Sequence, residues 1–286
     1  MRVFFVPVAN RPECAAALKA AFDLAQRLGS SVEGCHIRPH SDSKVALPED
    51  LGSVVNDEEI WQTLSRGKNS NKTTVEAQKL FEAVAAHYNY EVVSKPRATP
   101  AAMWLEKVGS PDKLLSIHGP VSDLIVVSRP KSKQSKLARL FMLSAVMSTA
   151  RSVLIVPPNQ SKPIGRHVAI GWNRSPEAAA SVAAAMPLLQ QAERVTIIRG
   201  GVQPGIGPTA AQLANYLKFW GVSSSRVSVS RKLDDRKGLL AAYRDAGADL
   251  LIMGAYSRSR LRQRLFGGVT EHMLHKATIP VLMRHH

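Results

Sequence analysis

The chain has 286 residues, 45% of them apolar, a length that fits two domains of about 140 residues each. No apolar run approaches the roughly 20 residues of a membrane-spanning helix, and two cysteines, Cys14 and Cys35, argue against a disulfide framework and for a reducing cytoplasm. The 38 lysines and arginines exceed the 22 aspartates and glutamates, giving a net charge of +16, but they are spread along the chain. We attribute this charge to solubility or an anionic small ligand, and it argues only weakly for nucleic acid.

Strands and helices alternate along the first half. The expected strands lie at 3–8, 32–37, 90–93, 123–128 and 150–156, and the expected helices at 14–28, 75–88 and 100–109. Residues 41–74 are polar and interrupt the alternation, which predicts an insertion found only in this half. The proline-rich run 157–163 predicts a linker, so we expect domains at 1–158 and 167–286, joined by residues 159–166.

The second half repeats the same order without the insertion. Its expected strands are 167–172, 195–198, 227–229, 249–254 and 279–283, and its expected helices are 178–191, 208–220, 238–246 and 271–276. Ser175 and Pro176 form a helix-start pattern, an N-cap followed by proline at the first helical position. Alternating strands and helices predict parallel sheets with right-handed crossovers.

Two aspartates mark corresponding positions of the repeat in the two halves. The run that begins at Asp123 mirrors the run that begins at Asp249, and the strand after Ala150 mirrors the strand after Ala277 at nearly the same spacing. In such sheets, ligands bind beyond the carboxyl ends of the strands. The loop that follows residue 254 is therefore the most informative part of the chain.

Small residues flank a basic segment in that loop. Glycine and serine stand at 254 and 257, and a Gly-Gly-Val-Thr run occupies 267–270, with four arginines between them. Small residues let backbone N–H groups approach a phosphate closely, and a helix beginning near Val269 would add its positive end. The pattern predicts a phosphate or nucleotide site, and the alternative is a loop that only turns the chain.

The stretches 249–261, 265–270 and 279–282, with the opening 169–178, resemble the universal stress protein family. With the repeat, the resemblance covers nearly the whole chain and implies the tandem form of that family. The fold class it implies is α/β: two flavodoxin-like domains of the HUP type, each with a mostly parallel five-stranded sheet flanked by helices. It also implies that the two domains pair through their final strands, and that a homodimer of whole chains can form.

Nucleotide-binding members of the family carry Gly, two residues, Gly, nine residues, and Gly followed by Ser or Thr. Here Ser257 replaces the second glycine, Gly268 replaces the hydroxyl residue, and Asn173 replaces the acidic residue after the first strand. The resemblance thus implies a partly retained site for ATP or another adenine nucleotide, which can bind together with magnesium. Its residues are Gly171, Asn173, Met253, Gly254, Ser257, Gly267, Gly268, Val269 and Thr270.

The corresponding loop of the first half has no glycine. Pro130 removes a backbone donor, and Met142 and Leu143 stand where the phosphate turn would be. We therefore expect no specific nucleotide binding by the first domain.

Other residue patterns are weaker. Trp172 can stack on a base, although a core or interface role is favoured. His272 and His275 have the spacing of metal ligands but lack a third ligand nearby, so no metal site is expected. No Gly-x-Ser-x-Gly elbow or Gly-x-x-x-x-Gly-Lys-Ser/Thr loop occurs.

We expect a cytoplasmic stress-response or regulatory protein, with at most weak ATP hydrolysis and no catalytic residues. The alternative is a protein-interaction module of the same fold that binds no nucleotide and recognises an unknown protein partner through residues 41–74. Neither membrane association nor a nucleic-acid partner is expected.

Overall fold

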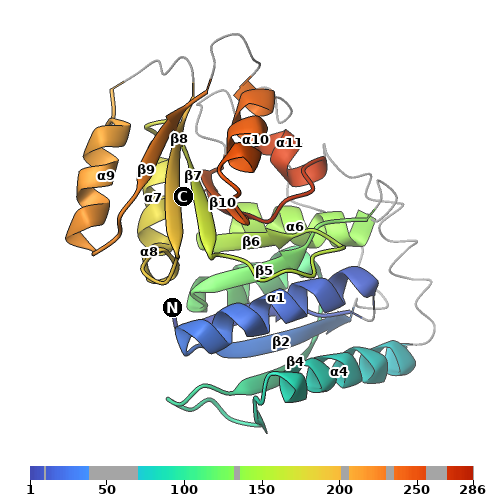
Figure 1. Ribbon diagram of the computed structural model, residues 1–286. Coiled ribbons are helices and arrows are strands. Elements are labelled where there is room, and N and C mark those ends of the chain that lie inside the picture. The colour runs from blue at the N-terminus through green and yellow to red at the C-terminus, as the bar shows by residue number, and fades with distance from the viewer. Residues whose placement is uncertain are drawn as a thin grey trace. The chain divides into compact units, whose positions relative to one another are not determined.

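The computed structural model describes residues 1–9, 11–38, 70–131, 136–200, 206–229, 235–255 and 269–285. The chain divides into two units. The first comprises Met1–Arg151 with Ile155–Ser161, and the second comprises Ser152–Leu154 with Lys162–His286. Each unit is an α/β structure with a parallel sheet, which confirms the fold class (Figure 1).

Among its described residues, the first unit contains five whole strands in the order β3-β4-β2-β1-β5. Strand β6 is next to β5 in this order, and the division between the units falls within it. The paired strands β1–β2, β1–β5, β2–β4 and β3–β4 run parallel. Helix α1 packs against α4, and α5 packs against α6. The strands are β1 (Val3–Pro7), β2 (Ser31–Arg38), β3 (Val92–Val93), β4 (Ala102–Val108), β5 (Leu124–Ser128) and β6 (Ser152–Val156). The helices are α1 (Pro12–Leu28), α4 (Ser70–His87), α5 (Pro111–His118), a 3-10 turn at Gly119–Val121, and α6 (Lys136–Ser148).

The helix predicted at 100–109 is wrong, because strand β4 occupies most of that segment. Ala, Met, Leu, Glu and Lys are good helix formers, but every residue of β4 pairs with β2, from Val32 opposite Ala102 to Arg38 opposite Val108. The Trp104 ring also lies 5.5 Å from that of Phe81 on α4. Tertiary pairing overrides local propensity here, and the described part of the first half has six strands where five were expected.

The second unit has the strand order β11-β10-β7-β8-β9, and its pairs are all parallel, as the sequence predicts. The strands are β7 (His167–Trp172), β8 (Arg194–Arg199), β9 (Ser225–Ser228), β10 (Leu250–Gly254) and β11 (Val281–Arg284). The helices are α7 (Pro176–Ala184), α8 (Met186–Leu189), α9 (Ala210–Phe219), α10 (Asp235–Asp245) and α11 (Val269–His275).

One predicted helix of this unit is broken in two. Helix α7 begins as expected, with the Ser175 hydroxyl accepting the N–H of Ala178 at 3.1 Å and Pro176 at its first position. It ends at Ala184 instead of continuing to residue 191. Pro187 has no N–H to donate to a carbonyl group of the preceding turn, so the helix is interrupted at Ala185. The chain then forms the single-turn helix α8.

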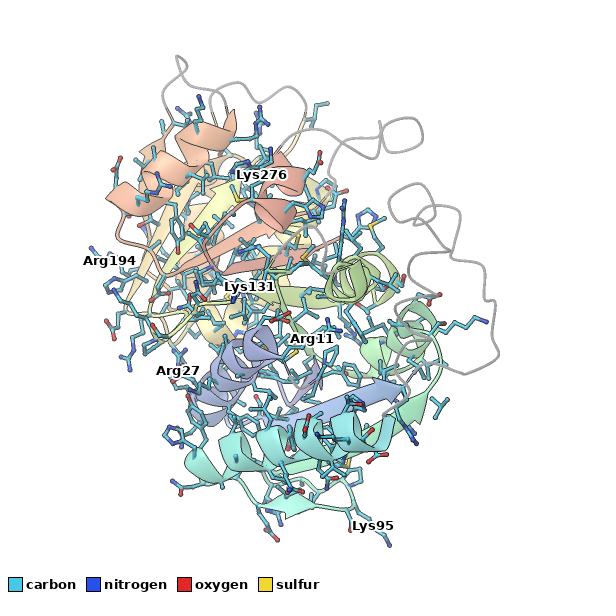
Figure 2. All side chains as sticks on the ribbon, turned by 90° about the vertical axis from the view of Figure 1, so that its right-hand side faces the viewer. Arg11, Arg27, Lys95, Lys131, Arg194 and Lys276 are labelled. Carbon is cyan, nitrogen blue, oxygen red and sulfur yellow. The ribbon has the colours of Figure 1, made fainter. Side chains whose placement is uncertain are left out.

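Basic side chains are dispersed over the surface of each unit. Figure 2 labels Arg11, Arg27, Lys95 and Lys131 on the first unit and Arg194 and Lys276 on the second. Within the ranges given above, no helix is long and apolar enough to cross a membrane.

Candidate functional site

The carboxyl ends of β7 and β10 lie side by side in the second unit. The two strands are parallel neighbours, and Gly171 stands opposite Met253. Asn173 follows the end of β7, and Gly254 is the last residue of β10. The register thus brings four of the predicted site residues to one edge of the sheet. Ser257, Gly267 and Gly268 lie outside the described residues, as do the four loop arginines.

Gly254 is enclosed by the first turn of α7. A Cβ atom at this position would lie 2.6 Å from the amide nitrogen of Ala178 and 2.8 Å from the carbonyl carbon of Glu177. Real Cβ atoms do not approach backbone so closely, so only glycine fits between β10 and α7. This packing is by itself a sufficient reason for the glycine, whether or not a phosphate binds nearby.

A buried hydroxyl joins three elements next to Gly254. The Ser181 side chain is fully buried, and its oxygen lies 2.8 Å from the carbonyl oxygen of Glu177 and 2.9 Å from that of Met253. The same oxygen accepts the N–H of Arg284 on β11 at 3.1 Å. Ser181 thereby connects α7 with the ends of β10 and β11, a role that the sequence analysis missed. Its only sequence signal was a serine within an alanine-rich helix.

Asn173 lies exposed in the turn between β7 and α7. Its side-chain oxygen accepts the N–H of Ser175 at 3.2 Å, while Ser175 caps α7. This turn presents the asparagine at the carboxyl edge of the sheet, close in sequence to the positive end of a nine-residue helix.

Two further side chains fix the same turn to the segment before α9. The Trp172 indole donates to the carbonyl oxygen of Pro208 at 2.8 Å. The Arg174 guanidinium donates to that of Gly207 at 2.8 and 2.6 Å. Trp172 is only 2% exposed, which confirms the core role that the sequence favoured over base stacking. The contacts of Arg174 were not predicted, because they join segments more than thirty residues apart.

Glu177, in the first turn of α7, lies beside Gly254. Its Cβ lies against the glycine, and its Oε2 atom is shielded from solvent without a hydrogen-bond partner among the described residues. A negative charge here opposes the approach of a phosphate unless a cation compensates it.

Val269 and Thr270 begin α11 and are half-buried. His272 and His275 lie further along the same helix. Among the residues that the structure describes, no group of three or more histidines, cysteines, aspartates or glutamates is placed to hold a metal ion.

The corresponding edge of the first unit is built differently. Ser128 ends β5 where Gly254 ends β10, and its hydroxyl lies 3.9 Å from the Cys14 sulfur. Arg129 follows and is buried, and this burial lowers the pKa of its guanidinium to about 10. Met142 and Leu143 are buried within α6. A buried cation and apolar side chains thus occupy this part of the first unit.

Comparisons with known proteins agree with this architecture. The model of the universal stress protein family matches residues 170–285. A universal stress protein from Archaeoglobus fulgidus DSM 4304 shares the fold over 99% of this chain and 98% of its own, with a TM-score of 0.66 and 14% identity. A functionally unknown protein from Pseudomonas aeruginosa PAO1 matches 100% of this chain and 92% of its own, with a TM-score of 0.51 and 14% identity. No curated protein matches the chain in sequence.

Proposed function

We propose that this chain, whose residues 170–285 match the model of the universal stress protein family, is a stress-response regulator whose second unit binds an adenine nucleotide weakly. Its catalytic activity is at most slow hydrolysis of ATP. The observation that carries the proposal is the pairing of Gly171 with Met253, since it joins the ends of β7 and β10 at one edge. Ligands of open parallel sheets bind at such edges.

The proposed roles follow from position and chemistry. Asn173 faces the ribose or base, next to the backbone of Gly171 and Met253. Gly254, Gly267 and Gly268 offer backbone donors to the phosphates, and Ser257 and Thr270 offer hydroxyl groups beside Val269. The enclosed position of Gly254 restricts its contribution to its backbone N–H.

Magnesium is the proposed companion of the nucleotide. The Glu177 carboxylate fits that ion, because Mg²⁺ in nucleotide sites is held by one or two carboxylates together with phosphate oxygens. When bound, the ion would neutralise phosphate charge. The shielded Oε2 atom of Glu177, which lacks a partner among the residues described, supports this assignment.

Native mass spectrometry of gently purified protein, with thermal-shift titrations of ATP, ADP and AMP, tests the proposal. We expect a co-purifying nucleotide or a stabilisation that Gly267→Asp abolishes. Ser223→Asp adds the same charge at an exposed position between α9 and β9 and should leave the shift unchanged. Asn173→Asp, which keeps the acceptor for Ser175, should strengthen binding, whereas Asn173→Ala should weaken it.

Magnesium dependence gives a separate readout. In the wild type, Mg²⁺ should increase the ATP-induced shift. Glu177→Gln should remove this dependence and increase the shift without Mg²⁺, because the repulsion is gone. An identical Mg²⁺ response in both proteins rules out the role of Glu177.

The second candidate is a protein-interaction module that binds no nucleotide. The Glu177 carboxylate favours it, because its Oε2 atom has no hydrogen-bond partner within the described ranges and would repel a phosphate. Empty protein with no shift at millimolar ATP would support this candidate, and deletion of residues 41–74, which lie mostly outside the described ranges, should then abolish partner capture.

A further inference from the structure

Strand β9 forms an open edge of the second sheet. It is the last strand in the order and pairs only with β8 among the described strands. All four of its residues are exposed. The Val229 N–H donates to the carbonyl oxygen of Arg199 on β8 at 2.9 Å. Because alternate residues of a parallel strand direct their N–H and C=O groups to opposite sides, those of Arg226 and Ser228 are directed away from β8. These groups are available to a further strand.

Aromatic side chains gather where α9 leads into this edge. Phe219 is 91% exposed, Trp220 46% and Tyr216 41%, and the Tyr216 and Trp220 rings meet edge to face. Helix α9 packs on β8 through Leu213, Leu217 and neighbouring alanines, so these aromatic groups are not required by that packing. Half of the exposed large apolar side chains in the described ranges lie between Ile206 and Val227. Exposed apolar side chains that cluster in this way are typical of an interaction site, whereas single exposed apolar residues are normal on any protein surface.

The segment that builds this edge is basic. The sequence has no aspartate or glutamate from Arg194 to Leu233. Arg199, Lys218 and Arg226 are exposed in this stretch. A charged residue on an edge strand commonly protects it from self-association, and two copies paired through β9 would bring their arginines together. The charge therefore disfavours a second copy and favours an acidic partner.

We propose that an extended acidic segment of a partner protein adds to β9 as a further strand. Its backbone pairs with Arg226 and Ser228, its carboxylates face the basic side chains, and an apolar residue contacts Phe219 and Trp220. We call Tyr216, Phe219, Trp220, Arg226 and Val227 the β9 edge surface. Unpaired backbone groups in a row favour a peptide over a nucleic acid, because strand addition derives its affinity from main-chain hydrogen bonds. This docking requires no nucleotide.

A fluorescein-labelled peptide of alternating glutamate and valine, ending in tryptophan, tests the proposal by anisotropy with the full-length protein. We expect it to bind at least about tenfold more tightly than the same peptide with lysine for glutamate. The double variant Phe219→Ser/Trp220→Ser should weaken binding by about tenfold or more. Ile117→Ser removes an exposed apolar side chain of the first unit and should change nothing.

Two substitutions at one position separate backbone pairing from charge. Arg226→Gln removes one charge and should weaken binding by about two- to fivefold. Arg226→Pro also removes the outward N–H, which an edge strand tolerates, and should weaken binding by about tenfold or more. Thermal unfolding verifies the fold of each variant. Equal binding of both peptides, equal effects of the two substitutions, or binding of oligouridylate in place of the acidic peptide would overturn the proposal.

Discussion

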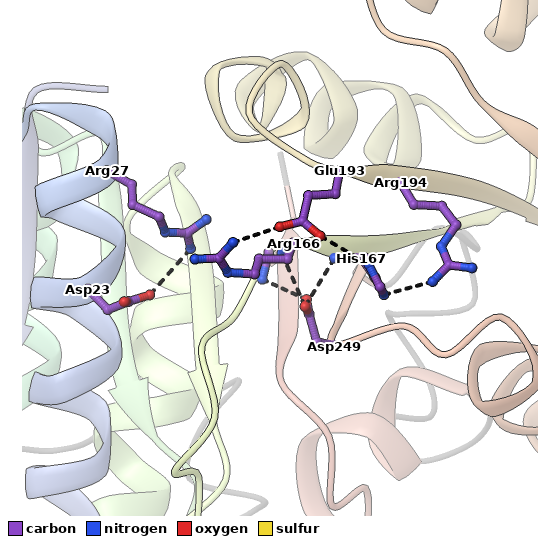
Figure 3. A network of polar contacts seen from close by, with 8 residues as sticks. Asp23, Arg27, Arg166, His167, Glu193, Arg194 and Asp249 are labelled. Atoms are coloured by element: carbon purple, nitrogen blue, oxygen red, sulfur yellow. Dashed lines mark hydrogen bonds and ion pairs between the residues drawn. The ribbon is translucent and has the colours of Figure 1, made fainter.

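The Asp249 carboxylate accepts the backbone N–H of His167, the first residue of β7, at 3.0 Å (Figure 3). The same carboxylate accepts the N–H groups of Gly165 at 2.6 Å and Arg166 at 3.1 Å. One side chain at the start of β10 thus fixes the entry into β7. Because β7 and β10 carry the candidate site at their other ends, Asp249 sets the register on which that site depends.

Asp123 does the same in the first unit. Its carboxylate accepts the N–H groups of Arg2 and Val3, the latter at 3.1 Å, and so holds the start of β1 next to β5. The sequence repeat around the two aspartates therefore has a physical cause. Each half needs an acceptor at this point, because the first amide groups of a strand that enters a parallel sheet otherwise lack partners.

Asp249→Ala should lower the free energy of unfolding of the second unit by about 2 kcal/mol or more, because three amide donors lose a charged acceptor. Urea unfolding monitored by circular dichroism measures the change. Asp245→Ala is the matched control, since this aspartate is exposed at the end of α10 and should change stability by less than about 0.5 kcal/mol. Equal effects of the two variants would contradict the role of Asp249.

Ser181→Ala should destabilise the protein by about 1–3 kcal/mol, because the part-buried N–H of Arg284 loses its acceptor and the buried carbonyl oxygen of Met253 loses its donor. Urea unfolding again provides the measurement. Ser223→Ala removes an exposed hydroxyl and should be nearly neutral. A Ser181→Ala variant as stable as the wild type would show that the three elements hold together without this hydroxyl.

The sequence predicts the parts of this fold that local signals specify. The Ser175 cap, the parallel strands implied by alternation, and the aspartate repeat all depend on residues near one another in the chain or on simple spacing. Strand β4 has no such local signal, because its residues favour a helix and only the long-range pairing with β2 makes them extended. The helix break at Pro187 had a clear local signal that the alanine-rich pattern obscured.

The candidate site is predictable to a similar extent. The sequence identifies Asn173 and Gly254 at the ends of strands, and the pairing of β7 with β10 then brings them to one edge together with Gly171. The contacts of Ser181 and Arg174 depend on which distant carbonyl groups lie within reach, and no spacing in the sequence encodes that.

Gly254→Ala should lower the free energy of unfolding by about 2 kcal/mol or more, because its methyl group would overlap the backbone of α7. Gly171→Ala is the control from the adjacent strand. Its Cβ would lie 3.5 Å from the nearest atom, an ordinary contact, so it should be tolerated. Thermal unfolding of both variants without nucleotide measures the difference. Equal stability of the two would show that α7 can move aside, and Gly254 would then be explained better by a ligand.

Alkaline pH should weaken the first unit through Cys35. The thiol is fully buried on β2, and burial raises its pKa from 9.0 to about 12. In the unfolded chain the thiol ionises near pH 9, so between about 9 and 12 the unfolded state binds fewer protons than the folded state. Stability must therefore fall as the pH rises through that window, by up to about 1.4 kcal/mol per pH unit for one group.

Cys35→Ala isolates this contribution. The variant starts from a lower stability at pH 7, because a buried sulfur is lost, but its free energy of unfolding should decline less between pH 9.5 and 10.5 than that of the wild type. We expect a difference of about 1 kcal/mol over that interval. Burial also raises the pKa of Tyr90 to about 12, and its phenol donates to the carbonyl oxygen of Ser30 at 2.8 Å. Because Tyr90 is present in both proteins, its titration cancels in the comparison. Parallel pH profiles of the free energy of unfolding would mean that Cys35 ionises as readily in the folded protein as in the unfolded chain.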